Sequence, residues 1–174
     1  YSMLGNIIGG SNVAIGNNSL YSNASASRNI AIGLNAGYDF NTTGSTNNIF
    51  LGYDAGRGIV TGDANTIIGS NVTGLTSTLS NNIIIADGDG NQRINVTSTG
   101  NVGLGTTTAS EKLTVIGNTY LGGGLTLTGA LKDSTSATGT LGMIMQTTGT
   151  STQWVATSTL GLGNGTFLGL TDTP

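Results

Sequence analysis

Short apolar runs recur along the first half of the chain, each opened by an asparagine and, in four of five copies, closed by a glycine. The pattern is Asn, two residues, Ile or Leu, then Gly, and successive asparagines are 17, 19, 17 and 17 residues apart. A short, nearly constant period indicates one supersecondary unit stacked on itself. The chain is therefore predicted to be all-β, with a parallel β-roll or solenoid of about 17-residue coils. The repeat residues are Asn12, Ile15 and Gly16; Asn29, Ile32 and Gly33; Asn48, Leu51 and Gly52; Asn65, Ile68 and Gly69; and Asn82 and Ile85, with Ala86 in place of the last glycine.

Both faces of each short strand carry apolar residues. Side chains alternate along a strand, so Val13 and Ile15 share one face and Ala14 lies on the other. A coil of 17 residues can hardly bury two faces alone, so the second face needs partner chains. We therefore expect a homo-oligomer, and a symmetric homotrimer is the preferred form. The stacked equivalents of Val13 and Ile15 are Ile30 and Ile32, Ile49 and Leu51, Thr66 and Ile68, and Ile83 and Ile85.

A second small motif follows each repeat glycine, as in Asn35-Ala36-Gly37-Tyr38. It predicts a second short strand in every coil, with polar turns between the strands. The asparagine that opens each repeat has two interpretations. It either forms a hydrogen-bonded ladder with its stacked neighbours or occupies a turn with a left-handed backbone. Turn geometry is expected to dominate.

Three segments are expected along the chain. Residues 1–86 form the repeat block, and residues 83–97 read as a strand, a turn and a strand that close it. Residues 87–128 continue from that hairpin with short glycine-punctuated strands. Residues 129–174 are expected to form a β stalk that continues beyond the sequence, since no heptad pattern indicates a coiled coil.

Composition supports an all-β structure and excludes several functions. The 174 residues include 30 glycines, no cysteine and no histidine, and only 7% are charged, against roughly 25% in average globular proteins. The five basic residues are scattered and the net charge is −3, which argues against nucleic acid binding. The lack of cysteine excludes disulfides and thiolate sites.

No segment is expected to enter a membrane. The longest strongly apolar run, about Ile83 to Ala86, is far shorter than the roughly 20 residues that a spanning helix needs. The chain begins with what looks like the end of another coil and stops without a closing element, so it is interpreted as a segment of a longer polypeptide.

Two families share features with these residues. The repeats Asn12–Gly16 and Asn29–Gly33 resemble the head repeats of trimeric autotransporter adhesins, which implies a left-handed parallel β-roll, three chains side by side and display outside a bacterial cell. Those heads usually have shorter repeats, near fourteen residues. Gly100–Thr108, with Lys112–Val115, is similar to a segment common in phage tail fibres and tail spikes, although Ala109 stands where that segment usually has proline. Both resemblances imply an elongated homotrimeric β fibre, on a bacterial surface or on a virion tail.

The only acidic cluster is Asp87-Gly88-Asp89-Gly90-Asn91. Alternating Asp87, Asp89 and Asn91 oxygens could bind Ca²⁺ in a loop. The closing glutamate and flanking helices of an EF-hand are absent, and Asp-Gly is a favoured turn pair. A hairpin turn is therefore the preferred interpretation, and a weak calcium site is the alternative. No other metal site and no cofactor is expected.

Catalysis is not expected either. Serine chemistry lacks a histidine partner, and a glycosidase needs two close acids, for which Asp39 and Asp54 on neighbouring coils are the nearest candidates. Aromatic side chains could stack on sugars, but packing between chains is the preferred role; they are Tyr21, Tyr38, Phe40, Tyr53 and Trp154. The predicted function is a structural segment of an extracellular fibre that presents a binding tip to a host glycan or protein receptor. The alternatives are a polysaccharide-binding or polysaccharide-degrading β-helix of tail-spike type and, ranked last, ice binding by threonine arrays, which are not in register.

Overall fold

The protein is described by a computed structural model covering residues 1–41, 43 and 47–160. It divides into two compact units, one from Tyr1 to Thr119 and one that begins at Tyr120. The first unit contains a single sheet, and the second contains a separate two-stranded sheet.

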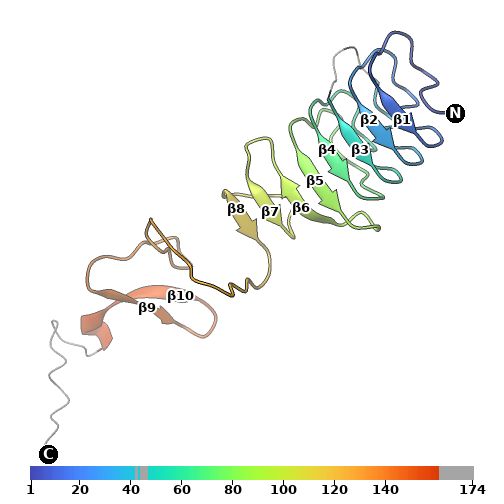
Figure 1. Ribbon diagram of the computed structural model, residues 1–174. Coiled ribbons are helices and arrows are strands. Elements are labelled where there is room, and N and C mark those ends of the chain that lie inside the picture. The colour runs from blue at the N-terminus through green and yellow to red at the C-terminus, as the bar shows by residue number, and fades with distance from the viewer. Residues whose placement is uncertain (42, 44–46, 161–174) are drawn as a thin grey trace, which may run out of the picture. The chain divides into compact units, whose positions relative to one another are not determined.

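The sheet of the first unit has eight strands in sequence order, β1 to β8 (Figure 1). The first five are parallel and pair in register, so that Ile15 lies beside Ile32, Ile32 beside Leu51, and Leu51 beside Ile68. This confirms the predicted parallel solenoid of about 17-residue coils. The strands are β1 (Val13–Ile15), β2 (Ile30–Ile32), β3 (Ile49–Leu51), β4 (Thr66–Ile68), β5 (Ile83–Ala86), β6 (Gln92–Val96), β7 (Val102–Leu104) and β8 (Leu113–Val115).

The chain reverses direction after β5. Strand β6 is antiparallel to β5, with a shift in register at Ile85/Ala86, and this confirms the predicted hairpin. Strand β7 is antiparallel to β6, and β8 is parallel to β7. The sheet thus continues past residue 86, and the first compact unit extends to Thr119.

The middle residue of each short strand points into the core of the coil. Ala31, Phe50, Ile67 and Ile84 are at most 1% exposed. The other core residues lie in turns rather than in a second strand, so the predicted second strand per coil is wrong for the described coils. Left-handed backbone at Asn18, Asn35, Asp54 and Asn71 explains the difference, because that conformation ends an extended segment. These turn residues of the core are Leu20, Ala26, Ala36, Phe40, Ala55, Ile59 and Val72.

The asparagines that open the repeats form a ladder through the interior. Oδ1 of Asn29 accepts from the backbone N–H of Asn48 at 3.0 Å and from its Nδ2 at 3.2 Å. The same pair of bonds joins Asn12 to Asn29 and Asn48 to Asn65. Asn29, Asn48 and Asn65 are fully buried, so these bonds satisfy amide groups that water cannot reach.

The ladder interpretation is therefore confirmed, and the expectation that turn geometry dominates at these asparagines is wrong. The left-handed backbone lies one residue earlier, at positions with φ between 54° and 62°. The turn and the ladder are thus neighbouring features, and the asparagine itself serves the ladder. The left-handed positions are Ser11, Arg28, Asn47, Ala64 and Asn81.

The repeat glycines allow consecutive coils to approach closely. Gly33 has φ of 135°, and a Cβ built on it would lie 2.4 Å from the carbonyl oxygen of Gly52 in the next coil. Both the backbone angle and the space therefore exclude a larger residue. Gly16, Gly52 and Gly69 are in the same situation.

The second unit contains one hairpin between residues 120 and 160. Strands β9 (Met143–Thr147) and β10 (Thr152–Ala156) are antiparallel, and the 3-10 helix η1 (Thr157–Leu160) follows. These are the elements found in the described part of the segment predicted to be a β stalk, of which residues 161–174 lie outside the described residues. No helix in the described part of the chain is long and apolar enough to cross a membrane.

Replacing Asn48 by alanine tests the ladder. The change leaves the N–H of Asn65 and the carbonyl of Gly62 without their buried partners, and Asn29 Oδ1 keeps the backbone N–H of residue 48 but loses the Nδ2 donor. We expect the free energy of unfolding to fall by about 3 kcal/mol or more, measured by urea denaturation at a fixed protein concentration. The control is Asn118→Ala, since Asn118 is exposed, and an equal effect of the two changes would contradict the ladder's contribution.

Gly33→Ala tests the close approach of the coils. Its Cβ would collide with the next coil at a left-handed backbone position, and we expect a loss of at least about 2 kcal/mol. Gly10→Ala is the matched control, because nothing lies within 4 Å of a Cβ built there. Thermal unfolding followed by circular dichroism measures both, and a stable Gly33 variant would show that the coils can separate at low cost.

Candidate functional site: an apolar face on the strand ladder

The outer face of the eight-stranded sheet is apolar along its whole length. The residues on either side of each inward-pointing middle residue form two parallel rows, as predicted for β1 to β5. The rows continue over the antiparallel strands, where Ile83 pairs with Val96 and Ile85 with Ile94. Fifteen of the sixteen positions are apolar and Thr66 is the exception; beyond β5 they are Ile94 and Val96, Val102 and Leu104, and Leu113 and Val115.

We call these sixteen residues the apolar face. Many of them are open to solvent in the single chain: Ile15 is 58% exposed, Ile32 39%, Ile68 39% and Leu113 61%. Eight strands spaced about 4.8 Å apart give a length of roughly 34 Å. Soluble proteins normally expose apolar side chains singly, and a continuous row of this length marks an interaction surface.

Covering the apolar face would be energetically favourable. Fully burying an aliphatic side chain contributes about 1.5–3 kcal/mol. Side chains that remain roughly 40% exposed would therefore contribute on the order of 1 kcal/mol each when covered. No charged residue lies among the sixteen positions, so no ionised group loses its water when the face is covered.

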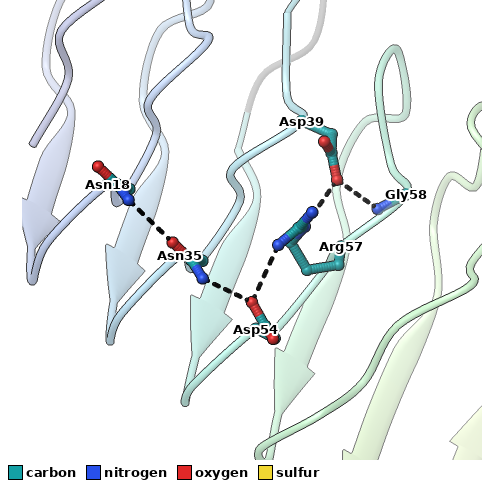
Figure 2. A network of polar contacts seen from close by, with 6 residues as sticks. All are labelled: Asn18, Asn35, Asp39, Asp54, Arg57 and Gly58. Atoms are coloured by element: carbon teal, nitrogen blue, oxygen red, sulfur yellow. Dashed lines mark hydrogen bonds and ion pairs between the residues drawn. The ribbon is translucent and has the colours of Figure 1, made fainter.

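A polar network runs along another side of the coils (Figure 2). Nδ2 of Asn18 donates to Asn35, and Nδ2 of Asn35 donates to Asp54, so three consecutive coils are joined at equivalent positions. Arg57 then donates to both Asp54, at 3.1 Å, and Asp39, at 2.8 Å. Asp39 also accepts from the backbone N–H of Gly58.

This network brings together the two acids considered for glycosidase chemistry. The shared guanidinium of Arg57 pairs with both carboxylates, and its hydrogen bond to Asp39 is the main reason that the pKa of Arg57 is raised above its ordinary value. Both carboxylates are thus engaged by Arg57, whereas a glycosidase acid must reach the leaving group of its substrate. The geometry supports a structural clamp between coils.

Aromatic side chains of neighbouring coils stack on one another. The rings of Tyr21 and Tyr38 are 5.0 Å apart and nearly parallel, and the guanidinium of Arg57 lies 4.8 Å from the centre of the Tyr38 ring. Tyr38 thus uses both ring faces within the chain. These contacts join neighbouring coils of one chain. The expectation for the aromatic residues was packing between chains.

The acidic segment after β5 is a turn held by its first aspartate. Asp87 accepts from the backbone N–H groups of Asp89 and Asn91, from the side-chain amide of Asn91, and from Arg93, with which it forms an ion pair. The hydrogen bond from the Asn91 side chain, followed by that from Arg93, lowers the pKa of Asp87 to about 2. No group of three or more acidic, histidine or cysteine side chains gathers to hold a metal in the described ranges. Protein donors already occupy the Asp87 oxygens that the calcium interpretation requires.

No protein-family model matches this chain, and no curated protein or solved structure is significantly similar to it.

Acid should loosen the hairpin turn. Because the pKa of Asp87 is depressed from 3.8 to about 2 in the folded chain, its contribution to stability is complete above about pH 4 and is lost as the pH falls through about 2. We expect Asp87→Asn to be less stable than the wild type at neutral pH, with a smaller further loss between pH 4 and pH 2. Unfolding free energies measured over this range check it, and parallel pH profiles for the two proteins would contradict it.

Proposed function

We propose that this chain is a structural segment of an extracellular fibre, in which identical chains associate as a homotrimer through the apolar face. The observation that carries the proposal is the continuous run of fifteen apolar residues over eight strands. A surface of this kind needs a partner with the same repeat, and a second copy of the chain provides one at every strand.

The interior of the coils suits a stiff rod. Main-chain pairing between strands, the asparagine ladder and the close packing at the glycines all run along the direction of stacking. Each coil contacts mainly its neighbours, so the length of the rod can change by whole coils without a new core. The proposed role is to extend and to present a binding tip, and it requires no catalytic residue.

The proposal also implies where the fibre is displayed. The resemblance of the repeats to adhesin heads and of residues 100–115 to tail-fibre segments supports either a bacterial surface appendage or a virion tail. The partners are then identical chains along the rod and a host glycan or protein receptor at a distal end. Three linked copies would raise the avidity of weak receptor contacts.

The state of association is the first test of this proposal. A trimer would sediment with three times the chain mass of 17.4 kDa. We expect Ile32→Glu combined with Ile68→Glu to weaken association by a factor of about 100 or more, because unpaired charges would be buried in the interface. Analytical ultracentrifugation over a range of concentrations measures both.

Leu34→Glu is the matched control. Leu34 is 44% exposed, close to the 39% of Ile32, but it follows the repeat glycine and is not on the apolar face. The control should remain associated. A wild-type chain that stays monomeric at every concentration would overturn the proposal, and a stable dimer would retain the interface but refute the threefold assembly.

A further inference from the structure

A cavity of about 330 Å³ opens where the solenoid core ends. It lies between the inner sides of β5 and β6 and the segment from Gly74 to Leu79, and its wall also includes Thr97 and Thr107. The inner column that carries Ala31, Phe50, Ile67 and Ile84 in successive strands continues with Asn95. A polar residue thus replaces an apolar one at the point where the cavity begins.

Asn95 has an unsatisfied group. Its side chain is on the cavity wall, the residue is 7% exposed, and its Nδ2 donates to Gln92 Oε1 at 2.8 Å. Its Oδ1 is buried and has no hydrogen-bond partner. Leaving a buried acceptor unpaired costs about 1–3 kcal/mol, so a donor from outside the described chain would be stabilised there.

The asparagine ladder ends at the same cavity. Each earlier Oδ1 accepts from the next asparagine, but Asn82 is the last member, and within the described residues its Oδ1 receives no hydrogen bond. Its Nδ2 is already used by the carbonyl of Ser80 at 2.6 Å. Asn82 and Asn95 therefore both offer an acceptor oxygen, while one N–H of each Nδ2 is already used within the chain.

These groups define the chemistry of a ligand. It must supply hydrogen-bond donors to at least two amide oxygens. It should be neutral, because no charged residue lines the cavity, and it should have an apolar side for Leu75, Leu79 and Ile84. A ring that carries hydroxyl groups around its edge and C–H groups on its faces meets all three requirements. The volume of the cavity is at the lower end of the range for small-molecule pockets.

We propose that this cavity binds a neutral saccharide unit, with sugar hydroxyls donating to Oδ1 of Asn82 and Oδ1 of Asn95. The cavity is on the inner side of β5 and β6, whereas Ile83, Ile85, Ile94 and Val96 of the apolar face are on the outer side. Association through that face would leave the cavity open. Its role as a receptor contact rests on the proposed fibre function, but binding itself does not.

The experiment is a titration followed by NMR. Glucose, galactose, mannose and N-acetylglucosamine are each added to the isotopically labelled protein, and backbone amide shifts are recorded. We expect at least one sugar to shift amides around Asn82, Asn95 and Thr107. Shifts confined to other regions, such as the surroundings of Trp154, or no shifts with any of the four sugars, would overturn the proposal.

Asn95→Leu removes the unpaired oxygen and the bond to Gln92, keeps the number and branching of the side-chain heavy atoms, and alters no backbone group that pairs β6. We expect this variant to fold and to bind the sugar at least about tenfold more weakly, whereas the exposed control Asn118→Leu should bind as the wild type does. If Asn95→Leu does not fold, Thr107→Val on the exposed wall should weaken binding by several fold. Unchanged affinity in either folded variant would refute the site.

The same titration on the Ile32→Glu, Ile68→Glu protein separates this inference from the proposed assembly. Binding should persist in that variant whether or not it associates. Loss of association with retained sugar binding would support both proposals, and sugar binding by a wild-type monomer would support only this one.

Discussion

The structure depends on the pairing of a buried asparagine with its equivalent one coil away. An amide in this interior has no water to bond, so each Oδ1 from Asn12 to Asn65 accepts from the N–H of the next asparagine, and all but the last of them also from its Nδ2. That requirement fixes the register of every coil. The step from Asn29 to Asn48 shows its strength, because this coil has 19 residues instead of 17 and the pairing is unchanged. The two extra residues are accommodated outside the strand.

Fixed register has a direct consequence for the surface. A slip by one residue would exchange the two faces of a strand, so strict stacking keeps all middle residues inside and all flanking residues outside. The flanking residues are apolar for reasons that the single chain does not explain, since they remain exposed in it. The same constraint that builds the core thus aligns these residues into a continuous face on β1 to β5. The antiparallel pairing of β6 with β5 extends this face, because it places Val96 beside Ile83 and Ile94 beside Ile85.

The sequence predicted the register and the core strands, because both depend on a repeated residue type at a fixed spacing. It predicted the closing hairpin because a favoured turn pair lies between two strand-like segments. The sequence did not predict features that depend on where a residue lies in its coil and not on which residue it is. The left-handed residue before each ladder asparagine is Ser11, Arg28, Asn47, Ala64 or Asn81, and no single side chain marks it. The continuation of the apolar face onto β6 to β8 was missed because their spacing departs from 17 and two of the pairings are antiparallel. The tyrosine stack was assigned to contacts between chains because a repeat alone does not say which copies meet.

Unpaired hydrogen-bond acceptors lie at the end of the repeat. Four copies have a glycine with left-handed backbone that turns the chain into the next coil, and the fifth has Ala86, which stays extended and enters the hairpin. The parallel stacking of coils ends at this position. The last asparagine then has no successor, and Asn95 enters the inner column in place of an apolar residue. A ladder that satisfies every interior amide along its length must leave acceptors at its end. The break in the repeat is therefore the place in this unit where an outside molecule can complete the hydrogen bonding.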